Sequence, residues 1–445
     1  MRMSLARWWK QFGDRNPVLG AVLTLVSGTT VAQAITFVLQ IFIARVYSDV
    51  DKGYFGVYGA VTSFVITFAA LRFDVAIILP KDNRTARVLQ RIATRCIIVS
   101  SLLTSLVCIL AARVLRDHYH HSGPLMWWLM GSGITVFLAS QAVNLQYWLT
   151  RQGRFSDIAR NRVLQSIFVA GFQLLAGLVL HGGLSALIIG TMTGQLFTLA
   201  GLRRRAPELR RPLQEGTPGL RAVIHRYRRM PLLNGPNAFV DSIRNSGINL
   251  LIGAASVAAL GQFQLAWNVM QVPVALIAGS VSQVFLKKLS DATPGEMTPL
   301  VRSVLWRTAL ASVVPFALLY LLSPRIFPLV FGSTWDAAGY YARALTPWLF
   351  MNVITAPISN IFIVTERQSR LLGFAIVYCL VPLVWLRLSP FEIMPTVVVL
   401  SWLMTSMLGA MTVMALAVAR VYDRGPENHG GGRPPGDDGT EVPVS

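Results

Sequence analysis

The ionisable side chains that could do chemistry in this chain lie inside long apolar stretches. Asp241 and Arg244 are three residues apart in one stretch, and Arg72 and Asp74 are two apart in another. A charge in such surroundings costs roughly 3 kcal/mol on insertion scales, so it usually faces a polar cavity. On a helix, Asp241 and Arg244 can pair at this spacing, whereas Arg72 and Asp74 point to different faces. Arg72 and Asp74 therefore need other partners, such as another side chain, a ligand or water.

Amides extend the pattern around Asp241. Asn237, Asn245 and Asn249 recur with Asp241 and Arg244 at three- and four-residue spacing, which places them on one helix face. Asn268 and Gln271 add amides in the next apolar stretch. One interpretation is a neutralised pair that braces the fold. The length of the stripe favours the other, a cavity holding a cation and a carboxylate that can exchange a proton.

An arginine in such a cavity suits an anionic ligand, because its guanidinium fork can bind phosphate through two hydrogen bonds. We therefore expect Arg72 and Arg244 to contact phosphate and the amides of Asn237, Asn245, Asn249, Asn268 and Gln271 to line the cavity. Asp241 and Asp74 are the candidates for ion coupling. For Arg72 the alternative is a side chain that extends to the membrane interface. Amides, together with Tyr147 and Trp148, suit sugar hydroxyls better than a lipophilic drug.

Other site chemistries find little support. His118, His120 and His121 are close in sequence, but only Asp117 accompanies them, so we expect a solvated loop and no metal site. The chain carries no phosphate-binding glycine loop and no nucleophile motif, and we predict neither a cofactor nor an enzymatic activity. Movement of a substrate would then be driven by an ion gradient or by the substrate's own gradient.

The composition indicates the solvent in which these residues act. Of 445 residues, 53% are hydrophobic and only 13% are charged, and the mean hydropathy is +0.53. Soluble domains carry about 25% charged residues. A chain this apolar cannot cover itself with polar surface, so we expect an all-α polytopic membrane protein. The net charge of +20 could suggest nucleic acid, but the hydrophobicity excludes that partner.

About 20 apolar residues are needed to cross a bilayer as a helix. This length predicts twelve spans, over residues 18–44, 53–79, 96–115, 125–149, 163–180, 184–202, 231–253, 259–286, 308–323, 344–364, 371–387 and 394–419. With these spans, 31 of the 40 Lys and Arg residues lie on one side and seven on the other. The positive-inside rule makes the first side cytoplasmic, with both termini there.

The same map divides the chain into five parts. They are a basic cytoplasmic N-terminus (1–15), an N-terminal six-helix lobe (16–202), a basic cytoplasmic linker (203–230), a C-terminal six-helix lobe (231–420) and a disordered cytoplasmic tail (421–445). The longest external segment expected is 323–343. Pro273, Pro347, Pro357 and Pro382 are the expected bending points of the helices.

A short internal repeat links the two lobes. Gly53-Tyr54-Phe55 and Gly261-Gln262-Phe263 are separated by 208 residues, and each triplet lies at the start of a predicted span. A six-span repeat keeps its orientation in the membrane. The lobes are therefore expected to be related by a pseudo-two-fold axis along the membrane normal, an arrangement found in transporters that rock about a central cavity.

Three segments resemble a known family. They are Gly56 to Asp82, with Leu71-Arg72-Phe73-Asp74 followed by Ile77 to Asp82; Gly261 to Lys288, with Ala266, Pro273 and Gln283; and Phe331 to Pro347, with Trp335. These segments resemble the oligosaccharide flippases, the O-antigen and exopolysaccharide translocases, of the multidrug/oligosaccharidyl-lipid/polysaccharide flippase superfamily. Phe263 stands where that family often has tyrosine.

The resemblance implies a V-shaped transporter of the bacterial inner membrane. It would carry an undecaprenyl-pyrophosphate-linked oligosaccharide to the outer leaflet, with membrane lipid, a polysaccharide polymerase and a chain-length regulator as partners. The superfamily's lipid II flippases have two further helices, which argues against a peptidoglycan precursor. The alternatives are a drug/cation antiporter of the superfamily, which predicts more carboxylates than cations in the spans, and a membrane polysaccharide polymerase or ligase, which needs a large external loop.

Overall fold

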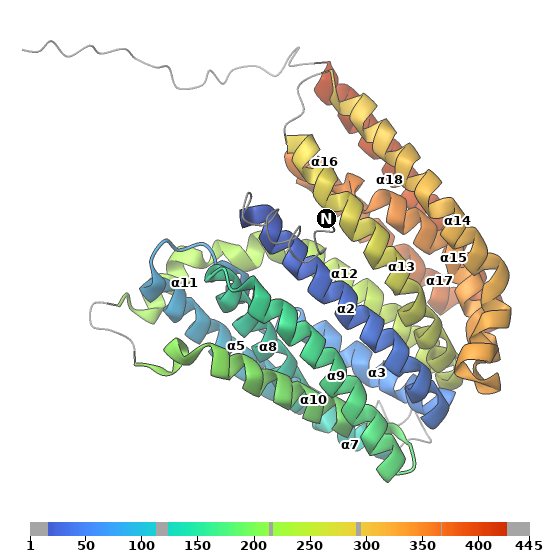
Figure 1. Cartoon of the computed structure of the whole chain (residues 1–445), viewed down its shortest axis with the longest axis horizontal. Helices are drawn as coiled ribbons and strands as arrows, with labels where there is room; N and C mark the ends of the chain where they lie inside the picture. The colour runs from blue at the N-terminus through green and yellow to red at the C-terminus, as the bar shows by residue number, and fades with distance from the viewer. Residues whose placement is uncertain (1–16, 113–122, 213–216, 291–294, 366, 425–445) are drawn as a thin grey trace, which may run out of the picture.

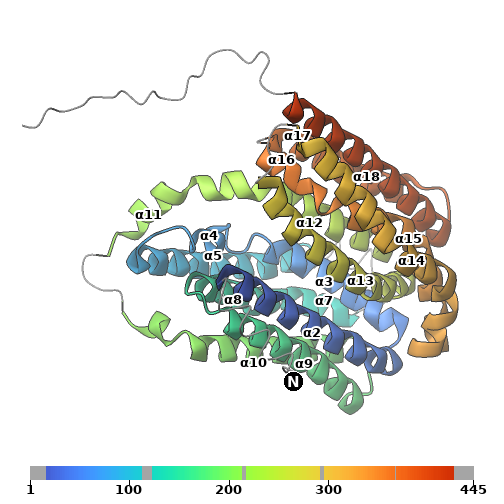
Figure 2. The ribbon, with the colours of Figure 1, turned by 45° about the horizontal axis from the view of Figure 1, so that its top comes forward.

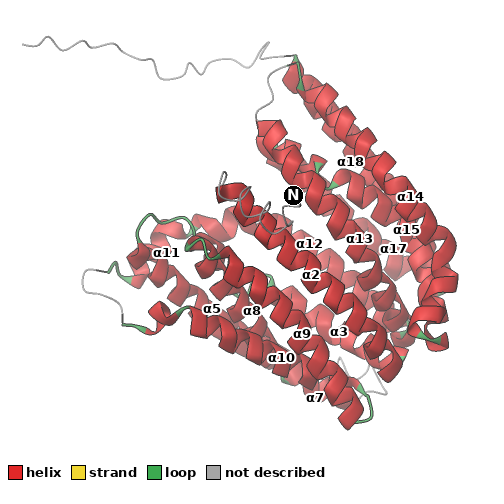
Figure 3. Cartoon of the chain, viewed as in Figure 1, coloured by secondary structure: helices red, strands yellow, loops and turns green. Residues whose placement is uncertain are grey.

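The structure is a computed structural model that describes residues 17–112, 123–212, 217–290, 295–365 and 367–424. Every regular element within these ranges is a helix (Figure 3). The expected N-terminus, the His118–His121 cluster and nearly all of the expected tail lie outside the described residues.

The helices form two groups that follow each other in sequence (Figure 1). The N-terminal group consists of α2 (Pro17–Val46), α3 (Asp49–Ile66), α4 (Phe73–Ala76), α5 (Asn83–Leu110), α7 (Gly123–Met130), α8 (Ser132–Arg151), α9 (Phe155–Val179) and α10 (Leu184–Arg205). The C-terminal group consists of α12 (Arg229–Ala255), α13 (Val257–Ser290), α14 (Met297–Phe331), α15 (Asp336–Thr355), α16 (Ile361–Val364), α17 (Gln368–Leu388) and α18 (Ile393–Asp423).

The connection between the groups is itself partly helical. It contains the 3-10 turn η1 (Pro207–Arg210) and the helix α11 (Leu220–Tyr227), which leads into α12 at one edge of the molecule (Figure 2). The α11 helix packs against α5, so this part of the basic linker is held on the N-terminal group.

Each of the twelve predicted ranges contains helix. By length and apolar composition alone, seven of the described helices could cross a membrane, or eight if the bent pair α7 and α8 is one span. Large apolar side chains are exposed on outer faces, including Leu102, Leu106 and Leu110 of α5 and Leu310 and Leu318 of α14. Such faces need a lipid environment, so the protein is a multi-pass membrane protein.

Three predicted spans are interrupted. The second is not one helix over 53–79, because α3 ends at Ile66 and α4 begins only at Phe73. The fourth bends by 49° between α7 and α8. The tenth ends as a regular helix at Thr355 and continues after Pro357 through the turn η3 (Ile358–Asn360) into α16. Pro357 therefore interrupts its span, as expected.

The helix bounds add two details to the expected geometry. Pro273, Pro347 and Pro382 lie within helices that continue through them. The expected external segment 323–343 is mostly helical, because α14 continues to Phe331 and α15 begins at Asp336, with the short turn η2 (Ser333–Trp335) between them. Flanking apolar residues extend both helices beyond the membrane-length window used for the prediction.

The two groups meet where α3 crosses α13. A Cβ atom on Gly53 would lie 1.8 Å from the carbonyl oxygen of Val257, and one on Gly261 would lie 1.9 Å from that of Asp49. Only glycine permits so close a backbone approach. The two contacts are reciprocal under the 208-residue offset, since Gly53 corresponds to Gly261 and Asp49 to Val257. The crossing thus has the local geometry that a two-fold repeat requires.

Polar contacts reinforce this junction. Gln262 Nε2 donates to Asp49 Oδ2 at 3.1 Å and to the Thr334 carbonyl at 2.7 Å, and Trp335 Nε1 donates to the Ala44 carbonyl at 2.7 Å. From this end, at the lower right of Figure 1, the two groups spread apart toward the ends that carry α11 and α16.

Candidate functional site

Helix α12 lies at the contact between the two helix groups. The Ser242 hydroxyl donates to the Thr67 hydroxyl at 3.4 Å, and the ring of Phe239 packs on Phe64 and Phe68 with centroid separations of 5.9 and 5.2 Å. These contacts bring α12 to the end of α3, where the second span is interrupted. The two sets of predicted charges therefore lie on neighbouring segments.

Asp241 and Arg244 form the pair that their spacing predicts. A guanidinium nitrogen of Arg244 lies 3.0 Å from Asp241 Oδ1, and a second contacts Asn245 Oδ1 at 3.4 Å. The arginine side chain is only 14% exposed, whereas the aspartate is 56% exposed. The carboxylate is thus the accessible member of the pair.

A series of contacting aromatic side chains fixes the position of Arg244. Its guanidinium carbon lies 4.6 Å from the ring centroid of Tyr378 on α17. The Tyr378 hydroxyl in turn accepts a hydrogen bond of 2.7 Å from Trp348 Nε1, and Trp348 packs on Trp267 at a centroid distance of 5.0 Å. A cation over an aromatic face gains about 1–2 kcal/mol when it is desolvated. Side chains of the C-terminal group therefore hold the guanidinium of Arg244 in position and set its orientation.

Arg72 is the last residue of the interruption between α3 and α4, and Asp74 lies in the first turn of α4. Leu71 and Arg72 have φ values of 47° and 60°, in the left-handed region. For non-glycine residues this conformation costs roughly 1–2 kcal/mol each. Among the described residues, the buried Nε of Arg72 has no hydrogen-bond partner. Asp74 is buried, and its Oδ1 accepts the N–H of Val75 at 2.9 Å. Strain of this kind is typical of functional segments.

The side chain of Arg151 stabilises the segment 77–82, which follows α4, a role that the sequence analysis missed. From the end of α8 its guanidinium donates to the backbone carbonyls of Ile77, Ile78, Pro80, Lys81 and Asp82, with distances of 3.0–3.3 Å to four of them. At the other side of the interruption, the Ser100 hydroxyl donates to the Ala69 carbonyl at 3.2 Å. Both residues satisfy carbonyl groups that a continuous helix would have satisfied itself.

Two polar cavities contain most of the predicted amides. One, of about 290 Å³, lies between α2 and α13 and is lined by Gln33, Thr36, Gln40, Asn268 and Gln271. The second, of about 280 Å³, is lined by Asn249 and again by Gln40 and Asn268. Asn237 and Asn245 are exposed. Asn249, Asn268 and Gln271 therefore do line cavities between the helix groups.

Not every polar residue of the spans belongs to this site. Asn144 is fully buried and donates to Thr94 Oγ1 at 3.1 Å and to Gln141 Oε1 at 3.2 Å, so Gln141 and Asn144 join α8 to α5. Trp148 is 1% exposed and donates to Glu208 Oε1 at 2.7 Å. It is therefore inaccessible to sugars. No cluster of metal-ligating side chains occurs within the described ranges.

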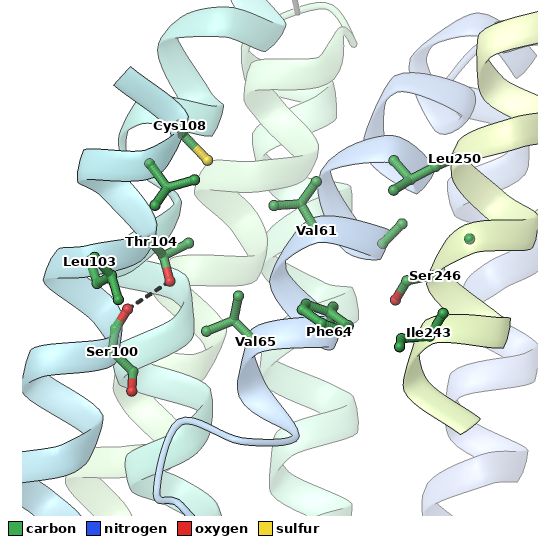
Figure 4. Close-up of a pocket in the computed structure, with 13 residues that line it drawn as sticks. Val61, Phe64, Val65, Ser100, Leu103, Thr104, Cys108, Ile243, Ser246 and Leu250 are labelled. Atoms are coloured by element: carbon green, nitrogen blue, oxygen red, sulfur yellow. Dashed lines mark hydrogen bonds between the residues drawn. The ribbon is translucent and has the colours of Figure 1, made fainter. Parts of the chain in front are cut away.

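An apolar cavity of about 510 Å³ lies beside α12 (Figure 4). Val61 and Val65 of α3, Leu103 of α5, and Ile243 and Leu250 of α12 line it. At 3.6 residues per turn, Ile243 and Leu250 lie on the side of α12 opposite Asp241, so the helix borders the apolar cavity with one side and carries the Asp241–Arg244 pair on the other.

The sequence also matches a known family. A family model described as "Polysaccharide biosynthesis protein" matches residues 42–340. The chain belongs to the polysaccharide biosynthesis protein family. The matched range of this polysaccharide biosynthesis protein includes Arg72, Asp74, Asp241, Arg244 and the helix crossing. No curated protein sequence matches the chain significantly.

Solved structures with the same fold are transporters and flippases. The lipid II flippase MurJ in an inward closed conformation superposes with a TM-score of 0.69 at 14% identity, covering 88% of this chain and 86% of its own. An inward-facing multidrug resistance MATE family transporter of the MOP superfamily gives 0.64 at 13% identity, covering 91% and 97%. An outward-facing MATE transporter gives 0.53 at 13% identity, covering 91% and 94%. The polysaccharide biosynthesis protein therefore has the fold of the MOP superfamily.

Proposed function

We propose that this protein flips undecaprenyl-pyrophosphate-linked oligosaccharide repeat units across the bacterial inner membrane for the synthesis of surface polysaccharide. The observation that carries the proposal is the two-sided character of α12, which carries the Asp241–Arg244 pair on one side and borders an apolar cavity of about 510 Å³ with the other. A lipid-linked saccharide has a matching division between diphosphate and hydrocarbon chain. The family match and the MOP fold support transport in preference to catalysis.

In this mechanism the two helix groups are six-helix lobes, 16–202 and 231–420, related by a pseudo-two-fold axis, with twelve spans in total and both termini cytoplasmic. The junction of α3 and α13 then closes the outer side, and the lobes are apart on the cytoplasmic side. The higher TM-score with the inward-facing than with the outward-facing MATE transporter supports this orientation.

Arg244 is the proposed residue that binds pyrophosphate in this cytoplasm-open state. Asp241 competes with the pyrophosphate for the Arg244 guanidinium. A carboxylate at 3.0 Å occupies one edge of the guanidinium that a phosphate would use. Protonation of Asp241 removes the negative charge and frees that edge, which couples binding of the anion to uptake of a proton. Arg72 supplies a second cation and Asp74 a second carboxylate, and the amides of Asn237, Asn245, Asn249, Asn268 and Gln271 bind sugar hydroxyls. Polymerase and chain-length regulator would receive the product.

Complementation of a flippase-null strain tests the proposal. The strain must build the same repeat unit, and the assay follows the leaflet on which the lipid-linked unit accumulates. We expect the wild-type protein to relieve cytoplasmic-leaflet accumulation, Arg244→Ala and Arg72→Ala to abolish the relief, and Arg160→Ala, which removes an exposed cation of α9, to leave it unchanged.

Protein levels are measured in each strain. Persistent accumulation with a well-expressed wild-type protein would refute the flippase function. Resistance to cationic drugs without polysaccharide export would instead identify an antiporter. Asp241→Asn should make turnover independent of a proton gradient, and an unchanged pH dependence would remove Asp241 from the coupling step.

A further inference from the structure

A lysine at the closed junction is buried in an unusual way. Lys52 is 6% exposed, and its Nζ has no hydrogen-bond partner among the described residues. Its position just before the predicted span 53–79 makes it an external loop charge by sequence, but it lies in the first turn of α3. A cation at a helix N-terminus also opposes the helix dipole. The sequence therefore keeps a positive charge where both burial and the dipole disfavour it.

The carboxylates nearest in sequence do not neutralise Lys52. Asp51 Oδ2 accepts from the Ser48 hydroxyl at 2.8 Å and its backbone N–H at 3.3 Å as part of a capping box. The carboxylate of Asp49 accepts from Gln262 Nε2 at 3.1 Å and from the N–H of Val50 at 2.9 Å. Neither forms a salt bridge with the lysine in the part of the chain that the structure describes.

The contact that Lys52 does make is too weak to offset its burial. Its Nζ lies 4.8 Å from the ring centroid of Trp335. A desolvated cation–π contact stabilises by about 2 kcal/mol, whereas burial of an ammonium costs several kcal/mol even after relaxation. An anion or water that reaches the ammonium group would offset the remaining cost.

Helix packing does not require a lysine at this position. Under the 208-residue offset Lys52 corresponds to Leu260, which is fully buried in the same crossing of α3 and α13. An apolar side chain therefore fills the equivalent place in the second half. The charge of Lys52 therefore has a role other than packing. Because leucine fills the equivalent position, Lys52→Leu is a suitable test substitution.

The lysine lines a cavity that an anion can reach. This is the cavity of about 280 Å³ described above, which at roughly 30 Å³ per water molecule has room for about nine waters. Gln40 and Asn268 line both this cavity and the one between α2 and α13. Asn249 also lines it and is five residues beyond Arg244, about 7.5 Å along the helix. A polar path thus leads from the helix-group interface toward Lys52.

We propose that Lys52 and the amides around it form a second phosphate-binding site, at the outer end of the transport path, which receives the substrate's pyrophosphate after Arg244. The inference rests on the proposed flippase function, but the site itself is defined by its affinity for a phosphate anion. Binding there brings negative charge to the junction of α3 and α13 and draws the ammonium away from Trp335, which loosens the contact between the lobes at the side where the substrate leaves.

Titration calorimetry of the full-length protein in nanodiscs of zwitterionic lipid, with inorganic pyrophosphate as the probe, tests the site. We expect Lys52→Leu to weaken a binding event at least tenfold, Lys52→Arg to retain it, and Arg45→Gln, which removes an exposed cation at the same end, to leave it unchanged. In the wild type, pyrophosphate should also protect Lys52 from reductive methylation, while the exposed Lys81 stays reactive.

Unaltered pyrophosphate binding in Lys52→Leu, or no binding by the wild-type protein at millimolar concentration, would overturn the inference. Failure of the wild-type protein in the complementation assay, with Lys52-dependent pyrophosphate binding intact, would refute flipping and leave the anion site standing. The reverse result would leave the flippase function standing and remove Lys52 from it.

Discussion

A single methyl group at the crossing of α3 and α13 should change the conformation of the whole protein. In Gly261→Ala the new Cβ would lie 1.9 Å from the Asp49 carbonyl oxygen, whereas real Cβ contacts are essentially never below 3.0 Å. The helices must therefore separate by at least about 1.1 Å at this point. Gly53→Ala imposes the same change from the other helix, against Val257.

The magnitude follows from the nature of the obstructing atoms. Overpacking costs about 1–3 kcal/mol, and the upper part of this range applies because a backbone carbonyl cannot rotate away as a side chain can. A cost of about 3 kcal/mol falls only on the conformation in which the junction is closed. The population of that conformation should drop about 100-fold relative to one with the junction open.

Distance measurements by electron spin resonance test this expectation. Spin labels at Val50→Cys and Leu329→Cys, two exposed positions on opposite sides of the junction, report its width in a protein lacking Cys96, Cys108 and Cys379. We expect Gly261→Ala to lengthen the distance and Gly59→Ala to leave it unchanged, because a Cβ on Gly59 meets nothing within 4 Å. An unchanged distance distribution in Gly261→Ala would refute the argument.

Three further changes test the parts around the site. Arg151→Ala should destabilise the segment 77–82 by about 2–4 kcal/mol, since several charge-assisted hydrogen bonds are lost at a partly exposed position, and faster hydrogen exchange there is the readout. Asn144→Ala should cost about 1 kcal/mol of stability in thermal unfolding without altering substrate preference, because its partners Thr94 and Gln141 join two helices and do not belong to the cavities described above. Hydrogen bonds from the Thr85 hydroxyl and N–H, with the nearby Arg151 guanidinium, lower the pKa of Asp82. Its cap on α5 should therefore persist above the unfolded pKa of about 4 and weaken as the pH falls through the lower folded value, with hydrogen exchange at the start of α5 as the measure. Normal protection of 77–82 in Arg151→Ala, or an α5 terminus insensitive to acid, would contradict these expectations.

Much of the helix layout could be predicted because lipid imposes a simple rule on sequence. Apolar length gave the positions of the helices, and three-residue spacing gave the Asp241–Arg244 pair. The interruption at residues 67–72 could not be predicted, because Phe68-Ala69-Ala70-Leu71 contains neither glycine nor proline. A tertiary contact, the hydrogen bond from the Ser100 hydroxyl to the Ala69 carbonyl, satisfies a backbone group within it.

The candidate site was predictable to the extent that its residues share a helix face. Asn249, Asn268 and Gln271 line cavities as the amide pattern indicated, whereas Trp148 does not, because Glu208 from a distant segment binds it. Lys52 was assigned to a loop because it precedes the apolar run by one residue. Its burial results from the crossing with α13, a contact between segments 208 residues apart that no local pattern reports.

The reciprocal crossing also restricts how the two halves of the gene can evolve. Each glycine faces the backbone of the other half, so no side-chain change within the same half can make room for a larger residue at Gly53 or Gly261. Other positions that correspond under the 208-residue offset can differ, as Lys52 and Leu260 do. The two glycines cannot, and family members should either keep both or change both together with the spacing of the helices.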